Sequence, residues 1–323
     1  MAYDSGRVME VERLMNAEIS YGKARVPLYR VYARPLTGVR PIPESPFTGR
    51  DNTLFALEVD VEVFGRNVLP AYTEGDNSAV VATDSMKNFV LRQALAYDGA
   101  TLEGYLYDLG RGLLTTYPHM QALRVTGHER PFLPARVSAG DDAAFADSPV
   151  LFSPSHGDCA LCELALDVQG DAIAVTDHRC GRVDMQLVKV TGSAFTRFVR
   201  DGYTTLPERG DRPLYIYLDV HWTYGDMGDL LSGDPARYIP SEQVRDLAAT
   251  VFHSFVSESI QHLVYEIGTR LLARFPGMAS VSFSAQNRTW DPVVVSEQDH
   301  RVKVYSDPFP AYGTINLTLR RDA

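Results

Sequence analysis

The segment Leu57–Val63, with the sequence Leu-Glu-Val-Asp-Val-Glu-Val, alternates strictly between apolar and acidic side chains. Successive side chains of a β-strand point to opposite faces of a sheet, so this alternation predicts a strand with one buried face and one wet face. The apolar face of such a strand must be covered by another layer of secondary structure. The segment therefore restricts the chain to folds in which a sheet is covered on one side.

The remainder of the first half predicts further strands around a pair of helices. In the strand expected over residues 20–33, Pro27 indicates an edge position or a β-bulge, because proline cannot donate a ladder hydrogen bond. Asp84 or Ser85 is expected to cap the first helix, and Thr101 the second. The elements expected are helices over 86–95 and 102–113, strands over 122–127 and 161–168, and a long polar loop at about 133–157.

The second half repeats this order of elements. Strands are expected over 173–190, 214–222, 279–285 and 315–319, and a helical region over 241–275, with its apolar stripe interrupted at Ser257–Ser259. Strands arranged around a helical pair favour an α+β fold, an antiparallel sheet covered by helices on one face. We therefore expect two halves, residues 1–170 and 171–323, that share their order of elements but negligible sequence identity.

The composition is that of an ordinary globular protein, and it excludes some partners. Hydrophobic residues make up 45% of the 323 residues, which is ample for a packed core. The net charge of -10 argues against a nucleic-acid or anionic membrane surface. A small anionic substrate remains open, because a local Arg or Lys can dominate a pocket.

The lack of a recognisable targeting signal and the small number of cysteines predict a cytoplasmic protein. The first residues lack the apolar core of a signal peptide, and no apolar run reaches the roughly 20 residues that span a bilayer. The last residues, Arg320–Ala323, are not a peroxisomal signal. Cys159, Cys162 and Cys180 are too few for a disulfide framework, so we expect reduced thiols.

Four separated segments together resemble the urate oxidase family. They are Tyr21–Lys23, Asn77–Asn88, Phe195–Arg212 and Asn287–Trp290, in the family's order and spacing. Val-Ala-Thr-Asp-Ser-x-Lys-Asn in the second segment and Arg-Asp-x-Tyr-Thr-Thr-Leu in the third are each quite specific. The similarity spans nearly the whole chain.

The resemblance implies a tunnelling fold, in which two antiparallel-sheet halves per chain associate on oligomerisation into a β-barrel pierced by a channel. Members of the family are homotetramers with active sites at subunit interfaces. They oxidise urate with O2 to 5-hydroxyisourate and H2O2 in purine catabolism, without a metal or organic cofactor. For this chain the resemblance therefore implies urate and O2 as partners, and neither nucleic acid nor membrane.

The resemblance assigns proton transfer to Lys23 and Thr83. Urate is an anion at neutral pH and must lose a further proton before it reacts with O2, so the site needs a base. Lys23 would be that base, provided that desolvation or a partner keeps its amine neutral, and the Thr83 hydroxyl would relay the proton. Without the resemblance, Lys23 would be interpreted as an exposed strand lysine and Thr83-Asp84-Ser85 as a helix N-cap.

Other residues would hold the substrate. The backbone amides of Thr83 and Asp84, at a helix start, would face the purine edge. The guanidinium fork of Arg212 would grip urate, and the Gln261 amide would donate and accept along the opposite edge. The remaining implied contacts are a stack of Phe195 on the ring and pocket walls from Leu206 and Ile260. Taken alone, Phe195 and Leu206 would be core residues and Gln261 would lie on an ordinary helix. Arg212 would form a surface ion pair of little energetic weight.

Asn287 is expected above the ring, where a neutral amide can orient O2 or the water that replaces it. The sequence departs here from the eukaryotic pattern of the family, in which a histidine stands two positions later. This chain has Thr289 at that position. We therefore expect Thr289, or water, to complete the relay.

Two other interpretations compete with this one. His156, Cys159, Cys162, His178 and Cys180 are zinc-type ligands, and GTP cyclohydrolase, another tunnelling-fold enzyme, uses a His/Cys zinc site. Against zinc, Cys159 and Cys162 on a strand would point to opposite faces. A purine-binding scaffold without chemistry is the second alternative, but it would have no use for a base such as Lys23.

Overall fold

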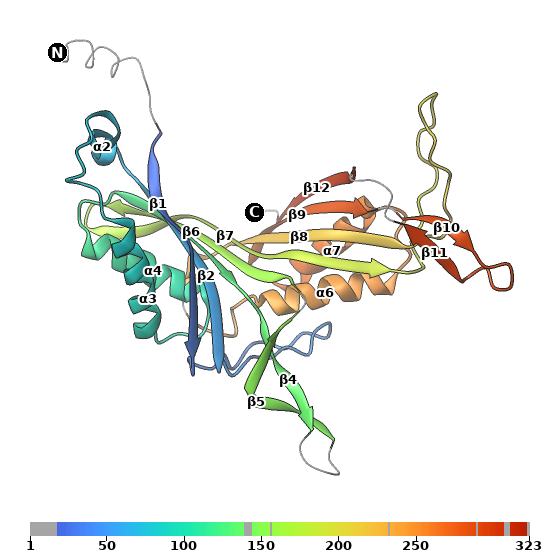
Figure 1. Cartoon of the computed structure of the whole chain (residues 1–323), viewed down its shortest axis with the longest axis horizontal. Helices are drawn as coiled ribbons and strands as arrows, with labels where there is room; N and C mark the ends of the chain where they lie inside the picture. The colour runs from blue at the N-terminus through green and yellow to red at the C-terminus, as the bar shows by residue number, and fades with distance from the viewer. Residues whose placement is uncertain are drawn as a thin grey trace.

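Figure 1 shows the computed structural model, which describes residues 18–138, 144–155, 157–231, 233–288, 290–306 and 311–321. Within these residues, eight strands form one sheet in the order β1-β2-β3-β6-β7-β8-β9-β12, and all neighbours are antiparallel. These strands are β1 (Ser20–Val31), β2 (Leu54–Phe64), β3 (Ala122–Glu129), β6 (Cys159–Gln169), β7 (Ala172–Lys189), β8 (Leu214–Tyr224), β9 (Met278–Arg288) and β12 (Gly313–Arg320).

Helices pack on the apolar side of the sheet (Figure 1). The helices α3 (Thr83–Ala96) and α4 (Leu102–Thr116) pack against strands of the first half, and α6 (Ser241–Ser254) and α7 (Ile260–Arg274) against strands of the second. Shorter helices are η1 (Arg66–Val68), α2 (Leu69–Thr73) and α5 (Met227–Leu231). Strand and helix side chains share one buried core. The predicted α+β fold is therefore confirmed. No helix in the described residues is long and apolar enough to cross a membrane.

The strand predicted from strict alternation is β2. Its residues Val59, Val61 and Val63 are buried in the core, and the acidic residues between them are half-buried on the other face. Pro27 lies in β1, which is an edge strand of the sheet and also carries a β-bulge between Lys23 and Val26. Both positions that Pro27 predicted are therefore present. The interruption at Ser257–Ser259 separates α6 from α7.

The long loop predicted at 133–157 is wrong. Most of it forms the hairpin of β4 (Phe132–Ser138) and β5 (Phe145–Pro154), which projects from the body of the molecule (Figure 1). A projecting hairpin has no core-facing side, so it forms through backbone pairing and side-chain bonds such as Arg136 to the Phe145 carbonyl (2.8 Å). Apolar alternation therefore cannot reveal it. The second hairpin, β10 (Asp291–Val295) with β11 (Lys303–Ser306), was not predicted either, because it too lacks apolar alternation.

The predicted cap of α3 is also wrong. The N-cap residue is Ala82, and no side chain of the described residues caps it. Asp84 lies inside the first turn, where its carboxylate accepts hydrogen bonds from Lys87 (2.6 Å) and Asn88 (3.0 Å). Asp84 is therefore occupied by its own helix rather than by the backbone before it. The Thr101 cap of α4 is confirmed, since its hydroxyl accepts from the Gly104 amide at 3.2 Å.

The two halves repeat each other in more than element order. Arg30 of β1 donates to the Ala94 and Tyr97 carbonyls at the end of α3, and Lys189 of β7 donates to the corresponding carbonyls at the end of α6, at 2.8 and 2.7 Å. Cations at helix C-termini satisfy the last carbonyls and complement the helix dipole. The same device therefore closes the first helix of each half.

The second helix of each half repeats as well. Thr101 caps α4, and Ser259 caps α7 by accepting from the His262 amide at 3.1 Å. Gly110 of α4 and Gly268 of α7 both lie so close to the sheet that a Cβ would come within 2.8 and 2.7 Å of a leucine side chain. Both helices can therefore pack at the same short distance from their strands.

The β-bulge is repeated too. The bulge of β1 follows Lys23, and that of β7 follows Arg182. Each contains a residue with positive φ, Arg25 (57°) and Asp184 (62°), whose amide donates to an aspartate of the next strand at 2.5 and 2.8 Å. The members of all these pairs are separated by the same spacing along the chain, to within one residue. The boundary between residues 170 and 171 stays a prediction, because one sheet runs across it.

We expect Lys189→Met to lower the free energy of unfolding by about 1–2 kcal/mol, because the last carbonyls of α6 lose their cation while the side-chain stem is kept. Urea denaturation measures the change. Arg301→Met is the control, since its exposed guanidinium pairs with Asp299 on the surface and should contribute little. Equal losses in the two variants would contradict the role given to Lys189.

Candidate active site

Lys23 lies beside the first turn of α3. The Tyr21 hydroxyl of β1 accepts a hydrogen bond from the Val81 amide (3.0 Å), and Arg30 binds the other end of the helix. β1 and α3 are therefore held side by side at both ends, and the charge of half-buried Lys23 acts on Asp84 in the first turn of α3. The roles predicted for Lys23 and Thr83 stay predictions.

No side chain of the described residues caps the start of α3. Thr83 is its first residue, and the first amides of an α-helix have no partner within the helix. These amides and the helix dipole favour an anion. A hydrogen bond from Lys87, with its charge, holds the pKa of exposed Asp84 below its ordinary value; Asn88 and the charge of Lys23 act in the same direction.

Arg212 is at the centre of a second group of predicted residues. Its backbone amide donates to the Ser193 carbonyl (2.8 Å), which folds the 193–212 segment back on itself, and its guanidinium lies 5.3 Å from the centre of the Phe195 ring. The residue is 8% exposed, and its Nε has no hydrogen-bond partner among the described residues. Burial and the charge of Arg209 lower the Arg212 pKa, while Asp291 opposes them.

The start of α7 lies against this segment. The Ala194 amide donates to the Ser257 carbonyl (2.8 Å), and the Ser257 hydroxyl donates to that of Ser193 (3.1 Å). Ile260, the first residue of α7, is buried, and Gln261 next to it is exposed. The turn between α6 and α7 thus brings the predicted pocket residues Ile260 and Gln261 to the segment that carries Phe195 and Arg212.

Asn287 lies at the far end of β9. The chain turns sharply after α7 and returns along the sheet, so the end of β9 comes back towards the start of α7. Asn287 alternates in phase with the buried residues Phe283 and Ala285, which places it on the helix-covered face. It pairs with Ile216 in β8, the strand that follows Arg212. Asn287 therefore lies at the same end of the sheet as the group of predicted residues around Arg212.

The remaining predicted residues are less well defined. Leu206 is half-buried in the 193–212 segment. Thr289 lies outside the described residues. Sequence reasoning missed Phe198, whose ring stacks on Phe195 with centroids 4.9 Å apart, and Arg209, whose backbone pairs with that of Phe195. No spacing rule marks these contacts, because they depend on the irregular path of the segment.

The two groups do not meet within one chain. Lys23 and Thr83 belong to β1 and α3. Arg212 precedes β8 and Asn287 lies near the end of β9, and these strand ends lie at the other end of the molecule (Figure 1). Strands lie about 4.8 Å apart, so the distance from β1 to β8 is about 25 Å. A single site containing both groups requires two copies of the chain.

The repeat gives each candidate residue a counterpart in the other half. At the common spacing, the counterparts are Arg182 for Lys23, Ser241 for Thr83, Glu242 for Asp84, Glu103 for Gln261, Glu129 for Asn287, Leu36 for Phe195 and Thr53 for Arg212. The pairing registers support these assignments: Glu129 pairs with β2 as Asn287 pairs with β8.

The cysteines do not form the cluster that the zinc interpretation needs. Cys162 and Cys180 lie opposite each other in β6 and β7, fully buried, and burial raises the pKa of the Cys162 thiol well above its ordinary value. His178 is engaged elsewhere, since its Nε2 accepts from the Tyr224 amide (2.8 Å). In the described residues no three His, Cys, Asp or Glu side chains gather as metal ligands. His156 lies outside the described residues.

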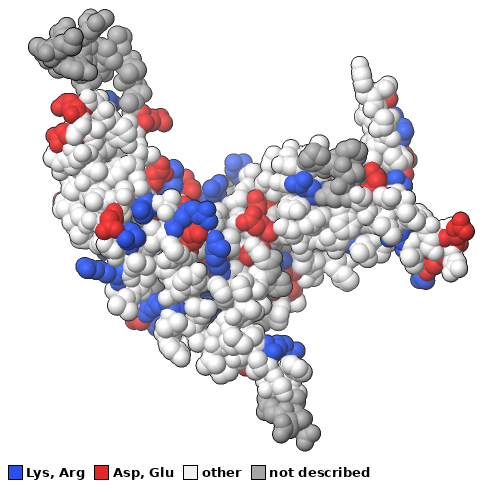
Figure 2. Space-filling view, viewed as in Figure 1, with Lys and Arg blue, Asp and Glu red and all other residues white. Residues whose placement is uncertain are grey.

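Charged groups are mixed on the face shown in Figure 2. Lys and Arg are interspersed there with Asp and Glu, without an extended patch of one sign. This face therefore offers no continuous basic track for a nucleic-acid backbone.

Comparison with known proteins identifies one family. A family model described as Uricase matches residues 60–155 and 178–316. The uric acid degradation bifunctional protein PucL of Bacillus subtilis (strain 168) is 46% identical over 311 residues, 96% of this chain and 63% of that protein. The chain thus spans less than two thirds of that relative. A uricase of Halalkalicoccus jeotgali is 50% identical over 290 residues, 90% of this chain and 94% of that protein.

Solved structures agree with the sequence comparison. The crystal structure of a urate oxidase from Bacillus sp. TB-90 matches with a TM-score of 0.90 and 42% identity, covering 94% of this chain and all of that one. The expected tunnelling fold is therefore confirmed at the level of the chain.

We expect Gly22→Ala to destabilise the protein by about 2 kcal/mol or more, because a Cβ there would lie 1.9 Å from the Val61 carbonyl oxygen, and that backbone cannot give way. β1 would have to shift at Lys23. Thermal unfolding measures the effect. The control is Gly202→Ala, where nothing lies within 4 Å of the added carbon. Unchanged stability of Gly22→Ala would contradict the close approach of β1 and β2.

Proposed function

The chain belongs to the uricase family, and from this premise we propose that it oxidises urate with O2 in purine degradation. The reaction consumes urate, O2 and water and yields 5-hydroxyisourate and H2O2, which balances without a further electron donor. The observation that carries the proposal is the buried Arg212 guanidinium, which lies beside the Phe195 ring and whose Nε has no hydrogen-bond partner among the described residues. A flat anion satisfies both groups at once.

Arg212 and Gln261 would fix the purine in its plane. The guanidinium fork can donate two parallel hydrogen bonds to a carbonyl oxygen and the adjacent ring nitrogen, and burial strengthens those bonds. Gln261 at the start of α7 can donate and accept along the opposite edge. Phe195 would stack on the ring, with Leu206 and Ile260 as pocket walls. Recognition of an anion by one buried cation agrees with the acidic composition of the chain, since the charge that matters is local.

Proton transfer would be carried by Lys23 and Thr83. Lys23 lies beside the start of α3, where the amides of Thr83 and Asp84 would also hold the purine edge. The Thr83 hydroxyl can both donate and accept, so it suits a relay between the amine and a water or peroxide above the ring. Asn287 would orient O2 or that water, and Thr289 or a water would complete the relay.

We further propose that the site forms between two copies of the chain, in a homotetramer whose sheets close into a barrel. Lys23 and Arg212 are too far apart to serve one substrate within a copy. The junction between the halves supports the arrangement. There Arg182 and Ser241, the counterparts of Lys23 and Thr83, approach to 3.4 Å beside the start of α6. An interface between copies built in the same way would bring Lys23 and Thr83 to Asn287.

The proposed chemistry requires no organic cofactor or metal, and we propose that the protein is located in the cytoplasm.

One assay distinguishes this proposal from two alternatives. A zinc-dependent purine or pterin enzyme would contain stoichiometric metal and lose activity with a chelator. A binding module would bind urate without turnover.

The assay mixes purified protein with urate in aerated buffer that contains a chelator. We expect urate's near-ultraviolet absorbance to disappear with one H2O2 formed per urate consumed. Tight urate binding without turnover would overturn the proposal in favour of a binding module. Turnover only before chelation, with metal found by elemental analysis, would favour the zinc enzyme.

Kinetic variants test the assigned roles. We expect Lys23→Met and Thr83→Ala to lower kcat by about 100-fold or more with little change in urate affinity, because they remove the proton relay. Arg212→Ala should raise KM strongly, because it removes binding in the ground state as well. Ser85→Ala, in the same helical turn as Thr83, is the control and should retain kcat. Near-native turnover of Lys23→Met would refute the relay.

A further inference from the structure

The counterpart of the proposed active site lies inside each chain, at the junction of the two halves. The start of α6, with Ser241 and Glu242, corresponds to the start of α3. It faces the end of β3 and the start of α4, with Glu129 and Glu103, which correspond to Asn287 and Gln261. This junction therefore contains counterparts of both groups of the proposed active site, and the same chain supplies both.

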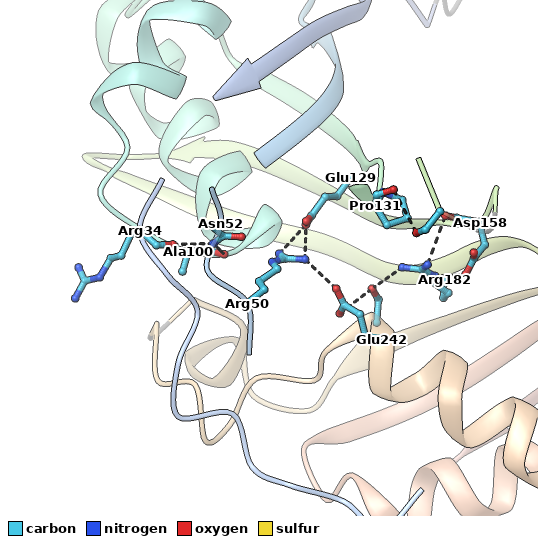
Figure 3. A network of polar contacts seen from close by, with 11 residues as sticks. Arg34, Arg50, Asn52, Ala100, Glu129, Pro131, Asp158, Arg182 and Glu242 are labelled. Carbon is cyan, nitrogen blue, oxygen red and sulfur yellow. Dashed lines mark hydrogen bonds and ion pairs between the residues drawn. The ribbon is translucent and has the colours of Figure 1, made fainter. Parts of the chain in front are cut away.

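A guanidinium group occupies the junction (Figure 3). Arg50 forms a fork with Glu129, at 2.5 and 2.8 Å, and contacts Glu242 at 2.9 Å. The central carbon of the Arg50 guanidinium, Cζ, lies 5.8 Å from the centre of the Phe55 ring. The planar cation thus sits between Glu129 on one side and Glu242 on the other, the counterparts of Asn287 and Asp84.

A second ion pair completes the cluster. Arg182 binds Asp158 at 2.5 Å, and both side chains are almost fully buried, at 1% and 4% exposed. Arg182 also donates to the Ser241 hydroxyl (3.4 Å), which in turn contacts Glu242 at 3.4 Å. The cation that corresponds to Lys23 is therefore held by a carboxylate and a hydroxyl.

Three positions of the junction differ in charge from their counterparts in the proposed active site. Where that site has the neutral amides Gln261 and Asn287, the junction has Glu103 and Glu129, both buried. Where it has Arg212, the junction has Thr53. Because no arginine stands opposite them at the position of Thr53, these carboxylates repel a planar anion and attract a planar cation.

We propose that the junction is a guanidinium-binding site, in which the Arg50 side chain lies between Glu129 and Glu242 and joins the two halves where the proposed active site would join two chains. The comparison with the active site rests on the proposed function, whereas the guanidinium site itself rests on the contacts above. The junction is closed by its own chain and does not take urate. It joins the halves as a bound ligand would.

The arrangement predicts chemical rescue. Arg50→Ala leaves Glu129 and Glu242 facing a space of guanidinium size, and an uncompensated buried charge is strongly destabilising. We expect the melting temperature of Arg50→Ala to fall, and millimolar guanidinium chloride to raise it again by about 2 °C or more relative to equal sodium chloride. The native protein, with the site filled, should show no such rise. Guanidinium denatures proteins at high concentration, so a stabilising effect has the opposite sign to its general action.

Two further variants test whether the rescue depends on the Glu129 carboxylate and on the buried position of the missing guanidinium. Arg50→Ala/Glu129→Gln removes the carboxylate that holds the fork and should respond to guanidinium much less than Arg50→Ala. Arg34→Ala, which removes an exposed guanidinium paired with Asp98 nearby, should show no guanidinium-specific rise. If Arg50→Ala does not fold, Arg50→Gln fills more of the space and is used in its place, with a smaller rise expected.

The proposal is overturned if guanidinium and sodium chloride act alike on the Arg50 variant that folds, or if the Arg34 variant responds equally. Urate turnover of the native protein is measured in parallel. Its absence would overturn the proposed function while leaving the guanidinium result to stand on its own. A missing rescue with normal turnover would overturn the guanidinium site alone.

Discussion

The rest of the structure depends on one open antiparallel sheet, which helices cover on one face and which does not close on itself within the described residues. In the described residues β1 and β12 are the edges of the sheet, and backbone groups at an edge remain free to pair with another strand. The candidate residues lie close to these limits, Lys23 on the edge strand β1 and Asn287 on β9 beside β12. Proposed catalysis and proposed assembly are therefore two consequences of one geometry.

The repeat explains how one scaffold acquires two kinds of junction. Helix caps, bulges and close glycine contacts are the same in both halves, so the elements that frame the junctions are the same. The side chains inside differ in charge. Arg50 with Glu129 forms ion pairs within the junction, whereas the proposed site has the buried cation Arg212, whose Nε has no hydrogen-bond partner among the described residues, and the neutral amide of Asn287. In the proposed function, the two junctions thus differ by a few residues on a frame that the two halves repeat.

Much of this could be predicted from sequence, for reasons that particular residues make clear. The alternation in 57–63 reports burial of one face, and Pro27 reports a missing donor; both are local properties. The hairpins β4–β5 and β10–β11 bury little, so apolar periodicity gave no sign of them. The four motif segments together predicted the family by resemblance, but local sequence could not show that Lys23 and Arg212 lie apart in one chain. That separation follows from strand order, which is set by contacts distant in sequence.

Hybrid assembly tests the central claim, that one site is shared by two copies, most directly. Lys23→Met and Arg212→Ala chains are each expected to be nearly inactive, and are then co-expressed with different tags and purified as hybrids. A site that takes Lys23 from one copy and Arg212 from the other is intact in the hybrid, so random mixing should restore about one quarter of native turnover. Verified hybrids with no more activity than the two parents would contradict the account.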